Sequence, residues 1–92
     1  MKPLTMFYLE DCGYCAKAFK ALDELVAENP SYRDVAITKV EESQNPALAD
    51  QYDYYAVPTF FDGDTKLFEA HLFMSYEDIR AEVKRVLDYA ME

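Results

Sequence analysis

Residues 4–19 read LTMFYLEDCGYCAKAF, and this stretch decides the fold. Its first six residues, 4–9, form an unbroken apolar run, which is typical of a central strand covered on both faces. The polar pair Glu10 and Asp11 ends this run, and Asp11 is a good N-cap for a helix that begins directly after it. We therefore expect a strand and then a helix, with two cysteines at the junction between them.

The predicted first helix leads into a second strand. Apolar residues recur at helical spacing along the helix, namely Phe19, Leu22, Leu25 and Val26. Asn29 and Pro30 end the helix, because the residue before a proline avoids helical backbone angles. Residues 34–40 (DVAITKV) are rich in β-branched side chains and predict a strand parallel to the first. Strand, helix and strand in this order form a βαβ unit.

The second half of the chain predicts a hairpin between two helices. Asn45 and Pro46 predict the start of a short helix. Residues 57–61 and 66–73 are expected to be antiparallel strands joined by a turn that contains Asp-Gly. A capping-box pattern, Ser75 with Asp78, precedes a last helix whose apolar stripe is Ile79, Val83, Val86, Leu87 and Ala90. The prediction is an α/β fold, β-α-β-α-β-β-α, with a central four-stranded mixed sheet flanked by helices, in a single domain over residues 1–92.

Composition and charge limit the partners. With 51% apolar and 29% charged residues, the chain has the composition of a globular protein with a packed core. Nine basic and eighteen acidic residues give a net charge of −9, which repels nucleic acid and anionic membrane surfaces. The apolar run at 4–9 is short for an export signal, and no run approaches the roughly 18 residues that span a bilayer. We expect a cytoplasmic monomer.

The cysteine pair, Cys12 and Cys15, carries the predicted chemistry. Residues three apart on a helix lie about 5 to 6 Å apart, which is also the usual Cα separation in a disulfide. Gly13 adds no side chain at this junction. The positive end of the helix favours the thiolate that attacks disulfides, although the two preceding carboxylates oppose it. The pair is therefore expected to suit disulfide reduction or exchange, with Cys12 and Cys15 as the catalytic residues.

Together with the step Val57-Pro58-Thr59, the motif Cys-x-x-Cys resembles the thioredoxin and glutaredoxin superfamily over nearly the whole chain. The resemblance implies a thioredoxin-like fold and a thiol–disulfide oxidoreductase that needs no cofactor beyond its own redox-active disulfide. It also implies that Pro58 is cis and lies beside the cysteines, and that the backbone of Val57 binds an extended substrate. The expected substrate contacts are Gly13, Tyr14, Val57, Pro58 and Thr59.

The two branches of the superfamily predict different electron donors. Tyr14 stands directly before the second cysteine and resembles the tyrosine of the Cys-Pro-Tyr-Cys motif of glutaredoxins. Gly13 and residues 39–46 (KVEESQNP) instead resemble thioredoxins. The region after Phe61 has one glycine, Gly63, where glutaredoxins carry a Gly-Gly turn that holds glutathione, and the acidic charge also disfavours this anion. We therefore predict a reductase of protein disulfides that receives electrons from a donor such as thioredoxin reductase. Glutathione-dependent reduction is the alternative.

Other residues have weaker assignments. Lys39 aligns with a lysine near the active site of thioredoxins, which makes it a candidate for proton transfer, but it could equally be a surface lysine at a strand end. Met6 stands where thioredoxins carry a buried aspartate. His71 is predicted to be an ordinary residue of the strand 66–73.

Two further alternatives stay open. The tyrosines at 52, 54 and 55 could line an aromatic groove for peptides or belong to the core. The chain could also be a redox-sensing or metal-binding module that keeps the fold without turnover. No metal site is predicted within one chain, because a structural zinc site needs four ligands and the chain has two cysteines and one histidine.

Overall fold

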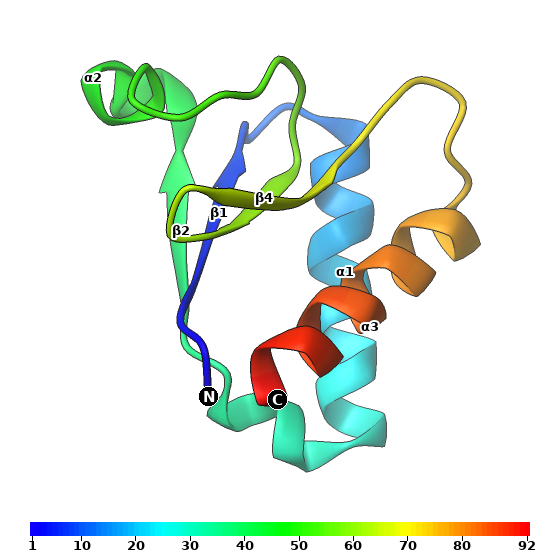
Figure 1. Ribbon diagram of the computed structural model, residues 1–92. Coiled ribbons are helices and arrows are strands. Elements are labelled where there is room, and N and C mark those ends of the chain that lie inside the picture. The colour runs from blue at the N-terminus through cyan, green and yellow to red at the C-terminus, as the bar shows by residue number, and fades with distance from the viewer.

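The computed structural model, which describes residues 1–92, has a sheet of four strands in the order β2-β1-β3-β4. Strands β1 (Leu4–Tyr8) and β2 (Ile37–Glu41) are parallel. Strand β3 (Thr59–Asp62) runs antiparallel to both β1 and β4 (Thr65–Glu69). The central place of β1 is the one that its continuous apolar run predicted. The mixed α/β architecture expected from the sequence is confirmed (Figure 1).

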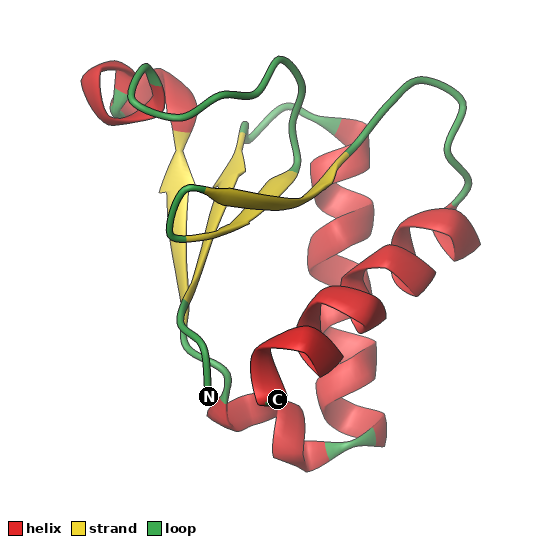
Figure 2. Cartoon of the chain, in the orientation of Figure 1, coloured by secondary structure: helices red, strands yellow, loops and turns green.

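Three helices and two short 3₁₀ turns accompany the four strands. Helix α1 (Gly13–Glu28) joins β1 to β2, α2 (Pro46–Ala49) is a single turn, and α3 (Tyr76–Met91) follows the hairpin. The 3₁₀ turns span Pro30–Asp34 and Glu42–Gln44. Figure 2 shows α1 and α3 packed together on one face of the sheet, with α2 apart from them at the end of β2. No helix combines the length and the apolar content that a membrane span requires.

Each face of the sheet has its own apolar cluster, because neighbouring side chains of a strand point to opposite faces. On the face covered by α1 and α3, Met6 and Phe60 pack against the apolar stripes of both helices. On the other face, Phe7 and Phe61 belong to a smaller cluster with residues of α2 and of the chain after it. The stripe predicted for α3 lies in the first cluster, and its capping box is present.

Of the three tyrosines before Pro58, two match the predicted alternative of core residues. Tyr52 and Tyr54 pack on Phe7, with ring centroids 4.7 and 4.9 Å away, and thus form part of the smaller core. Tyr55 is 94% exposed. Tyr52 and Tyr54 are partly buried, so Tyr55 is the most exposed of the three.

Two predicted element starts are wrong. Asp11 is not the N-cap of α1: Cys12 is, because its backbone is extended and its sulfur accepts the Cys15 N–H. The strand expected from residue 34 starts only at Ile37. Pro30 and the side chain of Asn29, which accepts the Ser31 N–H, favour the 3₁₀ turn that occupies the intervening residues.

The hairpin also differs from its predicted bounds. Strand β3 begins at Thr59 rather than at 57, since Pro58 has no N–H to donate to the sheet. Strand β4 ends at Glu69 rather than at 73, and the chain then forms a loop in which Phe73 has a positive φ of 70°. This conformation excludes Phe73 from a strand, and β4 has already ended before it. His71 is consequently an exposed loop residue, not the strand residue that we predicted.

Candidate active site

The two cysteines lie side by side at the N-terminus of α1. The backbone N–H of Cys15 donates a hydrogen bond to Cys12 Sγ over 3.2 Å. Cys12 is partly exposed, whereas Cys15 is only 1% exposed. One sulfur is therefore within reach of a bulky substrate, and the other is within reach of its neighbour alone.

The buried thiol of Cys15 has a higher pKa than an exposed cysteine thiol. Burial raises the pKa of Cys15 from 9.0 to about 12, and the hydrogen bond with Cys12 and the negative charge of Glu42 act in the same direction. Cys15 is therefore a neutral thiol near pH 7. Cys12 Sγ lies at the N-terminus of α1, where it accepts the Cys15 N–H and faces the positive end of the helix dipole.

A loop with a cis peptide bond faces the cysteine pair. The Val57–Pro58 bond is cis, as the family resemblance implied, and the Val57 carbonyl oxygen lies 3.7 Å from Cys12 Sγ. Pro58 is fully buried. Thr59 is also fully buried, and its hydroxyl donates to the Ala56 carbonyl. The side chain of Thr59 is thus out of reach of a substrate, and it supports this loop from inside.

Strand β4 holds the same loop in place through Glu69. The Glu69 carboxylate accepts hydrogen bonds from the N–H groups of Tyr55 and Ala56 over 2.5 and 2.7 Å. Partial burial alone would raise the pKa of Glu69, but these bonds and the one from Lys66 lower it overall. The carboxylate is thus charged near neutral pH. Sequence reasoning missed this role of Glu69, because the contact joins residues 13 and 14 positions apart in the chain.

Comparison with known proteins identifies the family. The family model for thioredoxin matches residues 2–85. The chain belongs to the thioredoxin family. Comparison with curated proteins gave no match.

Solved structures agree with this assignment. Thioredoxin 1 from the thermophilic eubacterium Thermosipho africanus TCF52B is similar with a TM-score of 0.58 and 16% identity, over 98% of this chain and 99% of that one. A mutant thioredoxin from Halobacterium salinarum NRC-1 has a TM-score of 0.55 and 24% identity, over 89% of this chain and 71% of that one. A malarial protein has a TM-score of 0.57 and 23% identity, over 89% and 92%. These structures confirm the thioredoxin fold.

The two residues between the cysteines have different environments in this thioredoxin-family protein. Gly13 is exposed, and a Cβ placed there would meet nothing within 4 Å. The Tyr14 hydroxyl accepts a hydrogen bond from the Phe73 N–H over 2.8 Å. No local sequence pattern signals this bond, which links the cysteine motif to the loop before α3.

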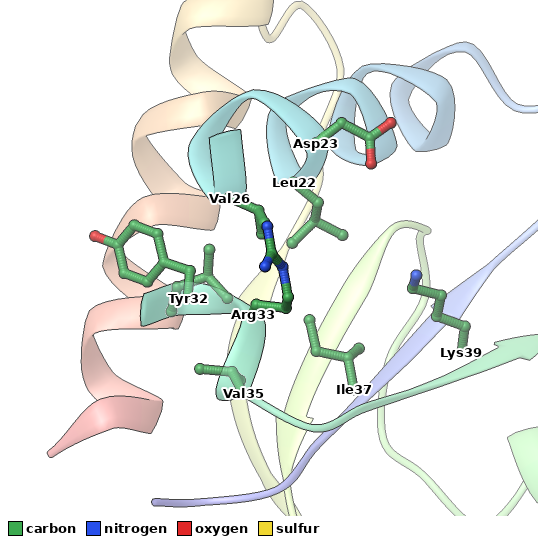
Figure 3. Close-up of a pocket in the computed structure, with 9 residues that line it drawn as sticks. Leu22, Asp23, Val26, Tyr32, Arg33, Val35, Ile37 and Lys39 are labelled. Carbon is green, nitrogen blue, oxygen red and sulfur yellow. The ribbon is translucent and has the colours of Figure 1, made fainter. Parts of the chain in front are cut away.

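Lys39, the candidate for proton transfer, has no hydrogen bond to either cysteine. Its ammonium lies 5.7 Å from the centre of the Phe19 ring. Lys39 and Arg33 line a cavity of about 300 Å³ between α1 and β2, and neither cysteine lines it. Figure 3 shows these two side chains with the other residues around the cavity. The exposed side chain fits the alternative of a surface lysine. Met6, the position at which the family resemblance led us to look for a buried aspartate, is fully buried in the apolar core.

Proposed function

We propose that this thioredoxin-family protein reduces disulfides in protein substrates, with Cys12 as the nucleophile and Cys15 as the resolving cysteine. The observation that carries the proposal is the unequal burial of two sulfurs held in contact. Cys12 is partly exposed and capped by the Cys15 N–H at 3.2 Å, and Cys15 lies buried behind it. A family of oxidoreductases and a Cys-x-x-Cys motif at a helix start support a redox role.

In the proposed reaction, the Cys12 thiolate attacks one sulfur of a substrate disulfide. A bond forms between Cys12 Sγ and that sulfur, the substrate S–S bond breaks, and the leaving thiolate takes up a proton. Cys15 then loses its proton and attacks Cys12 Sγ, which closes the Cys12–Cys15 disulfide and releases the second substrate thiol. Two electrons pass from the cysteine pair to the substrate, so no bound cofactor is needed.

Each turnover leaves the pair oxidised, so a partner must return two electrons. We propose a donor such as thioredoxin reductase, in a reducing compartment such as the cytoplasm. The net charge of −9 disfavours glutathione as the donor, because glutathione is itself an anion. Insulin reduction coupled to thioredoxin reductase, compared with the same assay coupled to glutathione and its reductase, tests this choice.

Two variants test the assigned roles. Cys15→Ser should accumulate a covalent adduct between Cys12 and the substrate, which mass spectrometry detects and added dithiothreitol releases. Cys12→Ser should lose insulin reduction and form no adduct, because the remaining thiol is buried and neutral. Full activity in Cys12→Ser would contradict the proposal. Circular dichroism of both variants shows whether the fold is retained.

A further inference from the structure

The cavity between α1 and β2 is lined mostly by apolar side chains. Leu22 and Val26 stand one turn apart on α1, and Ile37 of β2 faces the same cavity. The apolar lining is completed by Tyr32, Val35 and Leu87. Val26 and Ile37 are only partly buried, and β2 is the edge strand of the sheet, so no neighbouring strand closes this side. The cavity is thus apolar inside and open to solvent.

Hydrogen bonds fix the wall that the 3₁₀ turn Pro30–Asp34 contributes to the cavity. The Tyr32 hydroxyl donates to the Asp88 carboxylate on α3, and the Lys84 ammonium donates to the same carboxylate over 2.8 Å. The ring of Tyr32 is buried, so it cannot swing away without breaking this bond. The cavity is therefore preformed, as sites for small molecules usually are.

Two basic side chains border the apolar lining without a carboxylate partner. Arg33 and Lys39 both line the cavity, whereas the five ion pairs of the protein use five other basic residues. Figure 3 shows the Arg33 side chain extending from the 3₁₀ turn towards α1, with the Lys39 ammonium turned towards α1 as well. In a chain with nine basic and eighteen acidic residues, this cavity has an uncompensated local positive charge.

One carboxylate, that of Asp23, also lines the cavity. Figure 3 shows it projecting away from Arg33, and it forms an ion pair with neither basic side chain. Asp23 is exposed, so water and salt weaken its repulsion of an anion. The net charge of −9 acts over longer distances, and 0.1 M salt limits its range to about 10 Å. The two nearby cations therefore dominate the charge that a bound molecule meets.

We propose that this cavity binds an aliphatic carboxylate, with Arg33 and Lys39 on its carboxylate group and the apolar lining around its tail. The planar guanidinium of Arg33 offers two parallel N–H donors that match a carboxylate, and Lys39 adds a second positive charge. A volume of about 300 Å³ is at the low end for small-molecule sites, which favours one short chain with a small head group. Neither cysteine lines the cavity, so this inference is independent of the proposed disulfide reduction.

Titration of the isotope-labelled protein with sodium octanoate, followed by nuclear magnetic resonance, tests the inference. We expect the amide signals of Leu22, Val26 and Ile37 to shift together with a Kd of about 1 mM, which is reasonable for a ligand of this size. The uncharged alcohol 1-octanol has the same tail and should bind about tenfold more weakly. Acetate has the charge without the tail and should cause no saturable shift, because it buries almost no apolar surface.

Variants then test the role of each charge. Arg33→Gln should weaken octanoate binding about tenfold and Lys39→Gln about threefold, because the arginine can form two charge-assisted hydrogen bonds. Asp23→Asn removes the opposing charge and should tighten binding about twofold. Lys20→Gln is the matched control and should keep the wild-type Kd, since it removes one positive charge from α1 outside the cavity. All four side chains are exposed, and the spectra show whether the fold is retained.

Several outcomes would overturn the inference. They are the absence of a shift at Leu22, Val26 and Ile37, equal affinity for octanoate and 1-octanol, and an unchanged Kd in Arg33→Gln. A concentration-dependent shift of the same signals without any added molecule would assign the cavity to a second copy of the chain. Tighter binding of an acidic apolar peptide than of octanoate would assign it to a protein partner. Either result would also overturn the inference, and none of them affects the proposed function, because the titration involves no disulfide.

Discussion

Alkylation of Cys15 should rise about tenfold for each pH unit between about pH 7 and pH 10, without a plateau. Burial, the first cause, raises the pKa of this thiol from 9.0 to about 12. At about pH 7 the thiolate is then about one part in 10⁵, compared with about one part in 10² for a thiol of ordinary pKa. Because the thiolate is the reacting form, Cys15 should react about a thousandfold more slowly, before any steric shielding is counted.

The assay treats the reduced protein with iodoacetamide at a series of pH values and measures the label on each cysteine by mass spectrometry after digestion. The same series in concentrated urea is the control, since unfolding removes the burial and both thiols should then follow an ordinary titration. Glu42→Gln is the matched variant. Because the Glu42 charge raises the pKa of Cys15, this variant should label Cys15 faster at each pH in the folded protein.

A labelling rate for Cys15 that levels off near pH 9 in the folded protein would refute the reasoning. It would mean that the resolving thiol is as available as an exposed one. An unchanged rate in Glu42→Gln would remove only the electrostatic part of the argument, because burial acts without that charge.

Three further changes have expected outcomes. The pKa of Glu69 is lowered overall, so its anchoring of the Tyr55 and Ala56 amides should be present above about pH 4.5 and weaken as the pH falls through its titration. Amide exchange measures this, and Glu69→Gln should loosen the two amides even near pH 7. Gly13→Ala should raise the free energy of unfolding by about 0.5 kcal/mol in urea titrations, since the new Cβ meets no atom within 4 Å; a loss of stability would contradict this. Phe7→Ala should lower it by about 3 to 5 kcal/mol, because the ring is fully buried, and a loss under 1 kcal/mol would show that the smaller core contributes little.

The sequence predicted those parts of the fold that depend on local patterns. The apolar run at 4–9, the spacing of the cysteines and the capping box before α3 each involve residues close in the chain. These patterns predicted the strands, the helices and their order. The match to the thioredoxin family model confirms the resemblance that we based on the Cys-x-x-Cys motif and Pro58.

The remaining features depend on contacts between distant residues. Asp11 is chemically the better N-cap, yet the extended backbone at Cys12 makes its sulfur the acceptor. The bond between Tyr14 and Phe73 joins residues 59 positions apart, and without it nothing in the pattern HLFM marks a left-handed residue. The alternation of apolar and polar side chains predicted a strand through residue 73. That pattern carries no information on whether a residue has a positive φ.

The large apolar side chains of Tyr55, Leu72 and Phe73 face solvent, and this exposure affects how the protein behaves in concentrated solution. Three solvent-facing apolar side chains at one end of a small protein are a surface to which another copy can adhere. A net charge of −9 makes the copies repel each other, with a range of about 10 Å in 0.1 M salt and only about 3 Å in 1 M salt. Repulsion between the negatively charged copies therefore keeps the protein dispersed at low ionic strength. High salt screens this repulsion and leaves the exposed apolar side chains unchanged, so association should increase.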